Sequence, residues 1–227
     1  MVSIHRVSKA FGEQSVLRDF SLEVASGSIV AIVGPSGVGK STLLKLVAGV
    51  LAPDSGRVEI EATRMGYVFQ EPRLLPWRTA RENIALVLRS AGRGKHEARL
   101  EAGEWLARMR LQGFEDHYPS QLSGGMMQRV ALGRAFAAAP DIVLMDEPFS
   151  SLDAALKAEL LLLIGSLVKE RGTTVLYVTH DLSEALQLAD RVVEMVPDGI
   201  IKELGLEDRE ELLHRWITAL LSGREWV

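Results

Sequence analysis

The sequence SIVAIVGPSGVGKS, at residues 28–41, contains a β-branched apolar run followed by a glycine-rich loop. A short run of this kind is typical of a strand buried on both faces, so we expect a strand from Ser28 to Val33. After the loop, apolar residues recur at helical spacing, at positions Leu43, Leu44, Val47 and Val50. This spacing predicts a helix that begins near Gly39.

The loop at residues 34–41 matches the pattern G-x-x-x-x-G-K-[S/T] in the strand–helix setting that this phosphate-binding motif requires. Its glycines let backbone N–H groups surround phosphate oxygens, and the helix start adds a positive end. We expect Lys40 to reach the β- and γ-phosphates of a nucleotide and Ser41 to bind Mg²⁺. An accidental glycine-rich turn is disfavoured by the strand–helix setting. The residues predicted to contact nucleotide here are Gly34, Pro35, Ser36, Gly37, Val38, Gly39, Lys40, Ser41 and Thr42.

A second apolar strand, at residues 142–145, leads directly into Asp146 and Glu147. Such a strand would place Asp146 at its carboxyl end, beside the phosphate loop. We expect Asp146 to bind Mg²⁺ and Glu147 to polarise the attacking water. An acidic pair that merely ends a strand is the alternative, and the phosphate loop in the same chain favours the functional interpretation.

The segment LSGGMMQR, at residues 122–129, lies at the start of another predicted helix. Ser123 can cap this helix, and its glycines leave exposed N–H groups and a positive dipole end. Here the sequence resembles the ATP-binding cassette (ABC) family, in which Leu-Ser-Gly-Gly-x-x-Gln-Arg is the signature. A Ser-capped helix with a flexible start is the alternative, but other P-loop families lack this combination. The resemblance covers nearly the whole chain.

The resemblance implies roles for four further residues. Phe11 matches the aromatic residue that stacks on adenine, and Gln70 matches the glutamine that links the Mg²⁺ site to the helical subdomain. Asp153, in the segment Ser-Ser-Leu-Asp at 150–153, matches the loop that crosses the dimer interface. His180 matches the switch histidine near the γ-phosphate, where it would stabilise charge on the transferring phosphoryl group.

The resemblance also implies that one chain cannot complete its own site. Two chains would meet head to tail, so that Ser123, Gly124 and Gly125 of one chain contact the γ-phosphate held by Lys40 of the other. The implied cofactors are ATP and Mg²⁺, and ATP would close the dimer that hydrolysis reopens. The predicted catalytic residues are Glu147, His180, Lys40 and Gln70. The predicted metal ligands are Ser41, Gln70 and Asp146.

The predicted fold is α/β: a P-loop NTPase (RecA-like) core with a mixed, largely parallel sheet. Alternating residues at 2–8 and 19–25 predict an N-terminal antiparallel β subdomain. The pattern becomes helical from about 79 to 138, which predicts an inserted α-helical subdomain. We therefore expect one ABC ATPase domain over residues 1–227, with the nucleotide-binding core at 1–78 and 139–227 and the helical signature subdomain at 79–138.

Composition limits the classes of partner. The net charge is −4 and cysteine is absent, so no overall positive field, disulfide framework or Cys-ligated metal is available. The N-terminus has no apolar signal core, and the longest apolar stretch, at 160–168, is far shorter than a membrane span. A membrane role must therefore depend on partners. The alternative, a soluble ABC-type ATPase that acts on nucleic acid or ribosomes, is disfavoured because the chain has one cassette and no long coiled coil.

The segment FQEPRLLPW, at residues 69–77, resembles that of bacterial importers for nitrate, sulfonates and taurine. The resemblance implies a peripheral subunit on the cytoplasmic face of the cell membrane that powers import of a small anion. Its partners would be transmembrane permease subunits, a second copy of itself in a homodimer and, indirectly, an external (periplasmic or extracellular) solute-binding protein, with no nucleic acid. In the family this region helps form the groove for a permease helix; burial of Trp77 inside its own domain is the alternative.

Overall fold

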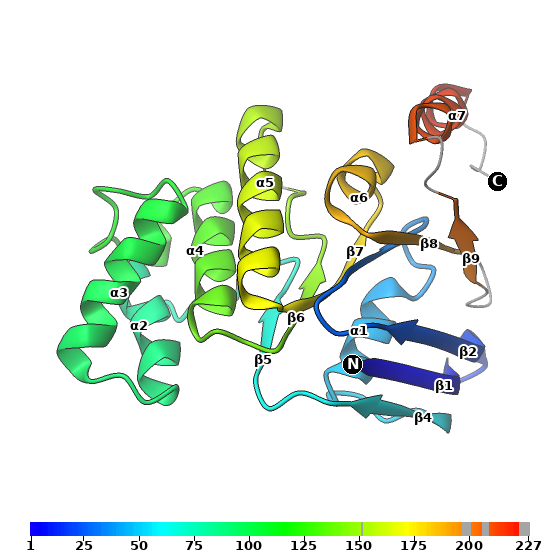
Figure 1. The fold of residues 1–227 in the computed structure, drawn as a ribbon, viewed down its shortest axis with the longest axis horizontal. Helices are drawn as coiled ribbons and strands as arrows, with labels where there is room; N and C mark the ends of the chain where they lie inside the picture. Colours follow the sequence, from blue (N-terminus) through cyan, green and yellow to red (C-terminus); the bar gives the residue numbers. More distant parts are fainter. Residues whose placement is uncertain (151, 197–200, 206–208, 223–227) are drawn as a thin grey trace. The chain divides into compact units, whose positions relative to one another are not determined.

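The computed structural model describes residues 1–150, 152–196, 201–205 and 209–222, and its ribbon is drawn in Figure 1. The chain forms two compact units. The first comprises Met1–Ile60 with Leu176–Val227, and the second comprises Glu61–Val175. Strand β7 (Thr174–Thr179) passes from the second unit into the first. The predicted division, with a helical subdomain over 79–138, stays a prediction.

A three-stranded antiparallel sheet begins the first unit (Figure 1). Its order is β2-β1-β4, with bounds Gln14–Val24, Val2–Phe11 and Ser55–Ile60. Apolar cross-strand pairs such as Val2–Val24 and Ile4–Leu22 are buried, which is the packing that stabilises paired strands. This sheet confirms the predicted antiparallel subdomain. Both hairpin strands extend beyond the predicted ranges, because the turn at Gly12 (φ 60°) is tight.

The first unit also contains strands β3 (Ile29–Val33), β8 (Arg191–Met195) and β9 (Ile201–Leu204). Strand β3 is buried along its whole length and pairs in parallel with β8, whereas β9 pairs antiparallel to β8. The mixed, largely parallel sheet confirms the predicted fold class. Strand β9 had no sequence prediction, because its polar residues depend on partners: Glu203 accepts a hydrogen bond from Arg191 at 2.9 Å.

Helix α1 (Lys40–Val47) follows the glycine-rich loop, and α6 (Leu182–Leu188) and α7 (Arg209–Ser222) lie later in the first unit. Leu43, Leu44 and Val47 are buried as predicted. The prediction for Val50 is wrong: its side chain is 67% exposed. The helix ends before Val50 because Gly49 adopts a left-handed conformation (φ 68°), which is a common helix terminator.

The second unit combines two parallel strands with helices (Figure 1). Strands β5 (Met65–Val68) and β6 (Ile142–Asp146) pair in register, Met65 with Ile142 and Val68 with Met145. The helices are α2 (Ala80–Ser90), α3 (Lys95–Arg108), α4 (Gly124–Ala137) and α5 (Ala154–Arg171), with a short 3₁₀ turn at Pro119–Gln121.

Helix α4 approaches α2 and α3 closely at Gly133. A Cβ atom there would lie 3.1 Å from Ile84 Cδ1 and 3.3 Å from Met109 Cγ. Ile84, Leu106 and Met109 are fully buried around this approach. Glycine costs about 1 kcal/mol of helix propensity relative to alanine, and here it allows the helices to pack at short range.

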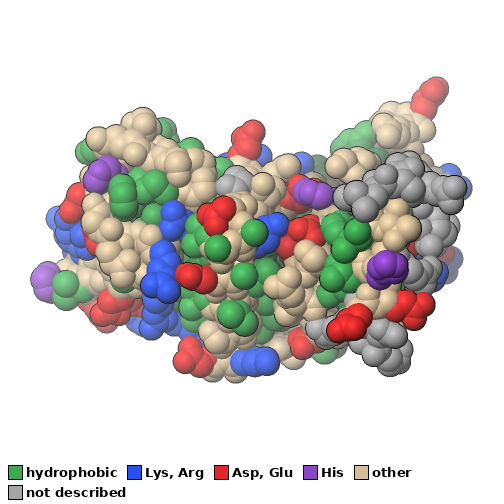
Figure 2. Space-filling model, turned by 90° about the horizontal axis from the view of Figure 1, so that it is seen from above, with side chains coloured by type: hydrophobic (Ala, Val, Ile, Leu, Met, Phe, Trp, Pro, Cys, Tyr) green, Lys and Arg blue, Asp and Glu red, His purple; other side chains and the backbone are tan. Residues whose placement is uncertain are grey.

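The surface mixes apolar and charged side chains. Figure 2 shows acidic and basic groups interspersed on the face drawn, outside the residues shown in grey. Several large apolar side chains are exposed, and among the described residues the largest exposed fractions belong to Leu162 (78%) and Trp77 (69%). Across the ranges that the structure describes, no helix is both long and apolar enough to cross a membrane.

Candidate functional site

The phosphate loop of the first unit encloses the Lys40 ammonium. Strand β3 ends at Val33, helix α1 begins at Lys40, and the tip of the loop, 35–37, is exposed. Lys40 itself is buried, and its Nζ donates hydrogen bonds to the carbonyl oxygens of Gly34 at 2.7 Å and Pro35 at 2.9 Å. The loop therefore carries a fixed positive charge at its centre, with an open rim.

Two glycines of this loop are required by close packing. A Cβ atom at Gly34 would collide with the carbonyl oxygen of Met195, and one at Gly39 would lie 2.7 Å from Val16 Cγ1. Gly39 also has φ 116° and caps α1 without a side-chain hydrogen bond. No side chain therefore blocks the first N–H groups of α1 at the cap. Such a helix start fits a bound phosphate, by hydrogen bonding and by its dipole.

Phe11 and His180 are the other predicted site residues of the first unit. Phe11 ends β1 with 49% of its surface exposed, and the Lys9 ammonium lies 5.7 Å from the centre of its ring. An exposed, flat ring of this kind can stack on a nucleobase. His180 is exposed directly after β7.

Hydrogen bonds on both sides fix the turn that carries His180. The Thr179 hydroxyl donates to Glu184 at 2.9 Å and accepts from the Asp181 backbone N–H at 3.0 Å. Asp181 then caps α6 by accepting from the Ser183 N–H at 2.9 Å. The imidazole is thus presented from a rigid turn.

In the second unit, Asp146 ends the buried strand β6 and is itself only 6% exposed. The next residue, Glu147, has φ 45°, an unusual conformation for a side chain larger than glycine. Its carbonyl oxygen accepts a hydrogen bond from the Ser150 hydroxyl at 3.2 Å, which holds this conformation. Strained residues of this kind persist where the surroundings hold them and occur often at functional sites.

The signature segment forms the start of α4. Ser123 caps the helix by accepting from the Met126 N–H at 3.3 Å, and both Ser123 and Gly124 are exposed. A Cβ atom at Gly124 would meet no atom of this chain within 4 Å. The helix start is therefore open to solvent, and the fold of this chain does not itself demand glycine at position 124.

Gln70 and Asp153 are the remaining predicted residues of the second unit. Gln70 is exposed just after β5. Asp153 caps α5 by accepting from the Leu156 N–H at 3.0 Å. Ser151, in the same predicted interface loop, lies outside the described residues. The predicted site residues that lie in the second unit are thus Gln70, Asp146, Glu147, Asp153 and those of the signature.

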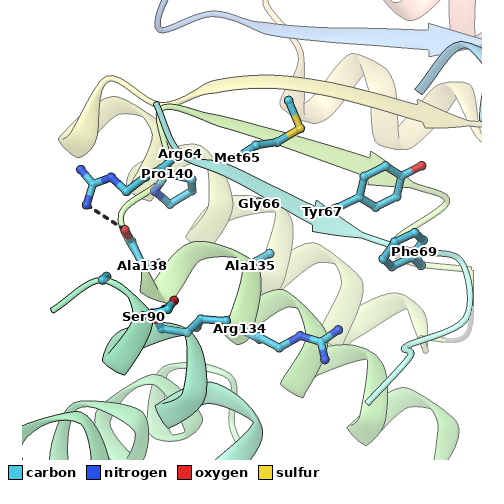
Figure 3. A pocket seen from close by; sticks show the side chains of 12 residues that line it. Arg64, Met65, Gly66, Tyr67, Phe69, Ser90, Arg134, Ala135, Ala138 and Pro140 are labelled. Atoms are coloured by element: carbon cyan, nitrogen blue, oxygen red, sulfur yellow. Dashed lines mark hydrogen bonds between the residues drawn. The ribbon is translucent and has the colours of Figure 1, made fainter. Parts of the chain in front are cut away.

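A groove of about 410 Å³ lies in the second unit between β5, the end of α2 and the end of α4 (Figure 3). Tyr67 and Phe69 stack along it with ring centres 4.1 Å apart, and the Arg73 guanidinium lies 4.2 Å from the Phe69 ring centre. The buried Tyr67 hydroxyl has no hydrogen-bond partner within the described part of the chain. Burial, and then the nearby charge of Asp146, raise the pKa of Tyr67. Trp77 is exposed, so the alternative of burial in its own domain is wrong.

Sequence reasoning missed three side chains that organise the segment between Gln70 and α2. Gln128 donates to the Phe69 carbonyl, and Arg134 donates to those of Pro72 and Arg73. Asn83, fully buried, accepts from the Leu75 N–H at 2.8 Å and donates to the carbonyls of Leu75, Arg78 and Thr79. A polar residue at a buried helical position was the available signal for Asn83.

Residues 17–150 match the family model described as ABC transporter. The chain belongs to this ABC transporter family. It is 43% identical over 216 residues to the sulfate/thiosulfate import ATP-binding protein CysA of Thermosynechococcus vestitus, covering 90% of this chain and 63% of that protein. It is 40% identical over 205 residues to the aliphatic sulfonates import ATP-binding protein SsuB of Bacillus cereus, covering 86% of this chain and 80% of that protein.

A solved structure extends the ABC likeness to three dimensions. The dimeric ATP-binding cassette MJ0796, in a post-hydrolysis state with ADP and Pi, matches with a TM-score of 0.83 and 34% identity, covering 91% of this chain and 99% of that chain. The chain spans about three-fifths of the length of the first curated relatives that it matches.

Proposed function

We propose that this chain is the ATP-binding and ATP-hydrolysing subunit of an ABC importer. The observation that carries the proposal is a pair of open helix starts. Helix α1 begins at Lys40 after Gly39, which gives no side-chain cap, and α4 begins at the exposed Gly124. Each offers N–H groups and a positive dipole end to an anion. One ATP between the phosphate loop of one chain and the signature of another uses both.

The proposed roles follow from side-chain chemistry. Lys40 holds the β- and γ-phosphates, and Phe11 stacks on adenine. Glu147 accepts a proton from the attacking water, a step worth about 10²–10⁴ in rate for a positioned base. His180 donates a hydrogen bond to the transferring phosphoryl group, and Ser123 with Gly124 and Gly125 of the second chain contacts the same phosphate.

Mg²⁺ fits the donor set predicted for it. Ser41, Gln70 and Asp146 offer hydroxyl, amide and carboxylate oxygens, which are the ligands that this hard cation prefers. Within the described ranges, no cluster of three or more His, Cys, Asp or Glu side chains forms a metal cage. Phosphate oxygens and water would therefore complete the coordination. When bound, Mg²⁺ neutralises charge on the phosphates.

The proposed partners are a second copy of this chain and two transmembrane permease subunits, with an external solute-binding protein acting through the permease. The groove lined by Tyr67 and Phe69 offers an aromatic surface to a cytoplasmic permease helix, and the exposed Trp77 offers a separate aromatic contact. A peripheral position on the cytoplasmic side of the membrane follows from this docking. The relatives named as sulfate/thiosulfate and aliphatic sulfonate import proteins support a small oxyanion, sulfate or a sulfonate, as cargo.

Purification from native membranes tests this function. The tagged chain is solubilised with detergent, and the proteins recovered with it are identified. We expect a multi-spanning membrane protein in equal amount, together with ATP-dependent uptake of labelled sulfate or a sulfonate in vesicles reconstituted with the complex. Recovery only in the soluble fraction, bound to DNA or ribosomes, would leave an ATPase but overturn the transport function.

A further inference from the structure

Two side chains of α4 reach the loop that carries Gln70. We define this Gln70 loop as residues 69–73, immediately after β5. Gln128 donates from Nε2 to the Phe69 carbonyl oxygen at 3.1 Å, on the near side of Gln70. Arg134 donates from Nη2 to the Pro72 carbonyl at 3.1 Å and from Nη1 to the Arg73 carbonyl at 3.0 Å, on the far side. Gln70 thus lies between two anchors on one helix.

Gln128 is buried and Arg134 is partly buried, which limits the access of water to these anchors. Gln128 is 1% exposed, and its Oε1 atom has no partner among the described residues. Burial lowers the pKa of Arg134, which is the mark of a guanidinium removed from water. Its hydrogen bonds to two consecutive carbonyls use the fixed fork of the guanidinium. Figure 3 shows the Arg134 side chain projecting from α4 in the groove that Phe69 also lines.

The loop is also held in a strained shape. Arg73 has φ 45°, in the left-handed region, and its carbonyl is one of the two that Arg134 binds. Its side chain stacks on Phe69, the residue that Gln128 binds. Strain of this kind costs about 1–3 kcal/mol and persists only where other contacts hold it. The α4 side chains therefore impose a particular path on the loop.

We propose that Gln128 and Arg134 are positioning residues for Gln70, holding the Gln70 loop to α4 so that the signature helix and Gln70 move as one body. A shift of the signature, at the first turn of α4, is then carried to Gln70 through three hydrogen bonds rather than through chain connectivity. This inference rests on the proposed function, because Gln70 is assigned there as a ligand of the Mg²⁺ site.

A double-mutant cycle on the full-length chain tests the inference. Arg134→Met removes the guanidinium and keeps an apolar stem of similar length, and Gln70→Ala removes the group to be positioned. The matched control is Arg171→Met, since Arg171 also donates to a carbonyl of α4, that of Phe136 at 3.2 Å, but has no hydrogen bond to the Gln70 loop in the described part of the chain. ATP turnover, KM and Tm are measured for each variant and for the Arg134→Met, Gln70→Ala double variant.

In the wild-type background we expect Arg134→Met to lower kcat about tenfold and to leave the KM for ATP little changed. In the Gln70→Ala background the same substitution should lower kcat by less than about twofold. Arg171→Met should leave kcat within about twofold in both backgrounds. An equal loss of kcat in the two backgrounds, or no loss in either, overturns the inference. If Arg134→Met does not fold, Arg134→Lys enters the same cycle, because lysine can keep one of the two hydrogen bonds.

Amide hydrogen exchange gives a readout that needs no hydrolysis. Arg134→Met should increase exchange at the non-proline amides of residues 70–73, and Arg171→Met should not. Unchanged amide exchange in the Gln70 loop would overturn the inference that Arg134 holds this loop to α4, even if kcat falls. If the wild-type chain hydrolyses no ATP, alone or with its permease, the proposed function fails, while the exchange result still decides whether Arg134 holds the loop.

Discussion

The Thr179 hydroxyl donates a 2.9 Å hydrogen bond to the Glu184 carboxylate, and both side chains are buried. The same hydroxyl oxygen accepts the Asp181 N–H. His180 lies between Thr179 and Asp181 in sequence, so its exposed imidazole is carried by a turn whose two ends are joined by a hydrogen bond to one buried oxygen atom. A buried hydrogen bond to a charged group contributes about 1.5–3 kcal/mol.

Thr179→Val tests the importance of this turn, because valine keeps the shape and removes the hydroxyl. We expect the free energy of unfolding to fall by about 1–3 kcal/mol, and ATP hydrolysis to slow because His180 is less well placed. Chemical denaturation and steady-state turnover measure the two effects. Thr179→Ser keeps the hydroxyl and should recover most of the turnover; equal turnover in the Val variant and the wild type would show that the bond does not position His180.

Glu147→Gln tests the assignment of the base. The amide keeps the size of the side chain but cannot accept the proton of the attacking water. We expect ATP to bind as in the wild type, hydrolysis to fall by about 10²-fold or more, and an ATP-bound dimer to persist in size-exclusion chromatography. A variant that hydrolyses ATP at the wild-type rate would refute the role of Glu147.

Ser123→Arg tests the open start of the signature helix. The new side chain would fill the exposed space where the γ-phosphate of the opposing site is proposed to lie. We expect ATP hydrolysis to be lost, while binding of ATP to the phosphate loop persists. Ser120→Arg, an exposed position before the signature, is the control; identical turnover in both variants would argue against the shared site.

Asp141 gives the second unit an acid-sensitive contact. Its Oδ2 accepts the backbone N–H groups of Arg64 and Thr63, each at 2.8 Å, and these bonds lower its pKa below the ordinary value of 3.8. The contact therefore stabilises the fold above that ordinary value and is lost as pH falls through the lowered pKa of the folded state. Asp141→Asn should flatten the decline in unfolding free energy between about pH 5 and pH 3. The same decline in both proteins would contradict this assignment.

The fold was predictable from residues whose local pattern already requires a structure. The run at 29–33 is buried along its length, and the glycines at 34 and 39 are needed where packing leaves no room for a side chain. Val50 was mispredicted because a left-handed glycine, not periodicity, ends α1. Strand β9 escaped prediction because its polar residues are stabilised by partners on the neighbouring strand β8, such as Arg191.

The residues of the candidate site likewise fall into those that a sequence motif marks and those whose role depends on tertiary contacts. Motif residues such as Lys40 and Ser123 are marked by spacing, since phosphate binding requires them at fixed offsets from a helix start. Gln128 and Arg134 bind carbonyl groups of a loop that is distant in sequence, whereas Asn83 binds those of the segment just before α2, and backbone acceptors leave no trace in sequence. Arg134 looks like an ordinary helix residue until the loop is placed against it, and Gln128 is marked only as a member of the signature.

Mixing two inactive variants tests the shared ATP site most directly. Lys40→Ala disables a phosphate loop, and Ser123→Arg blocks a signature, so neither variant alone can form a complete site. A mixed dimer has one site with both defects and one site with an intact Lys40 and an intact Ser123. We expect the mixture to hydrolyse ATP although neither variant does so alone. No gain of hydrolysis on mixing, under conditions in which the two chains associate, would contradict a site completed by the second chain.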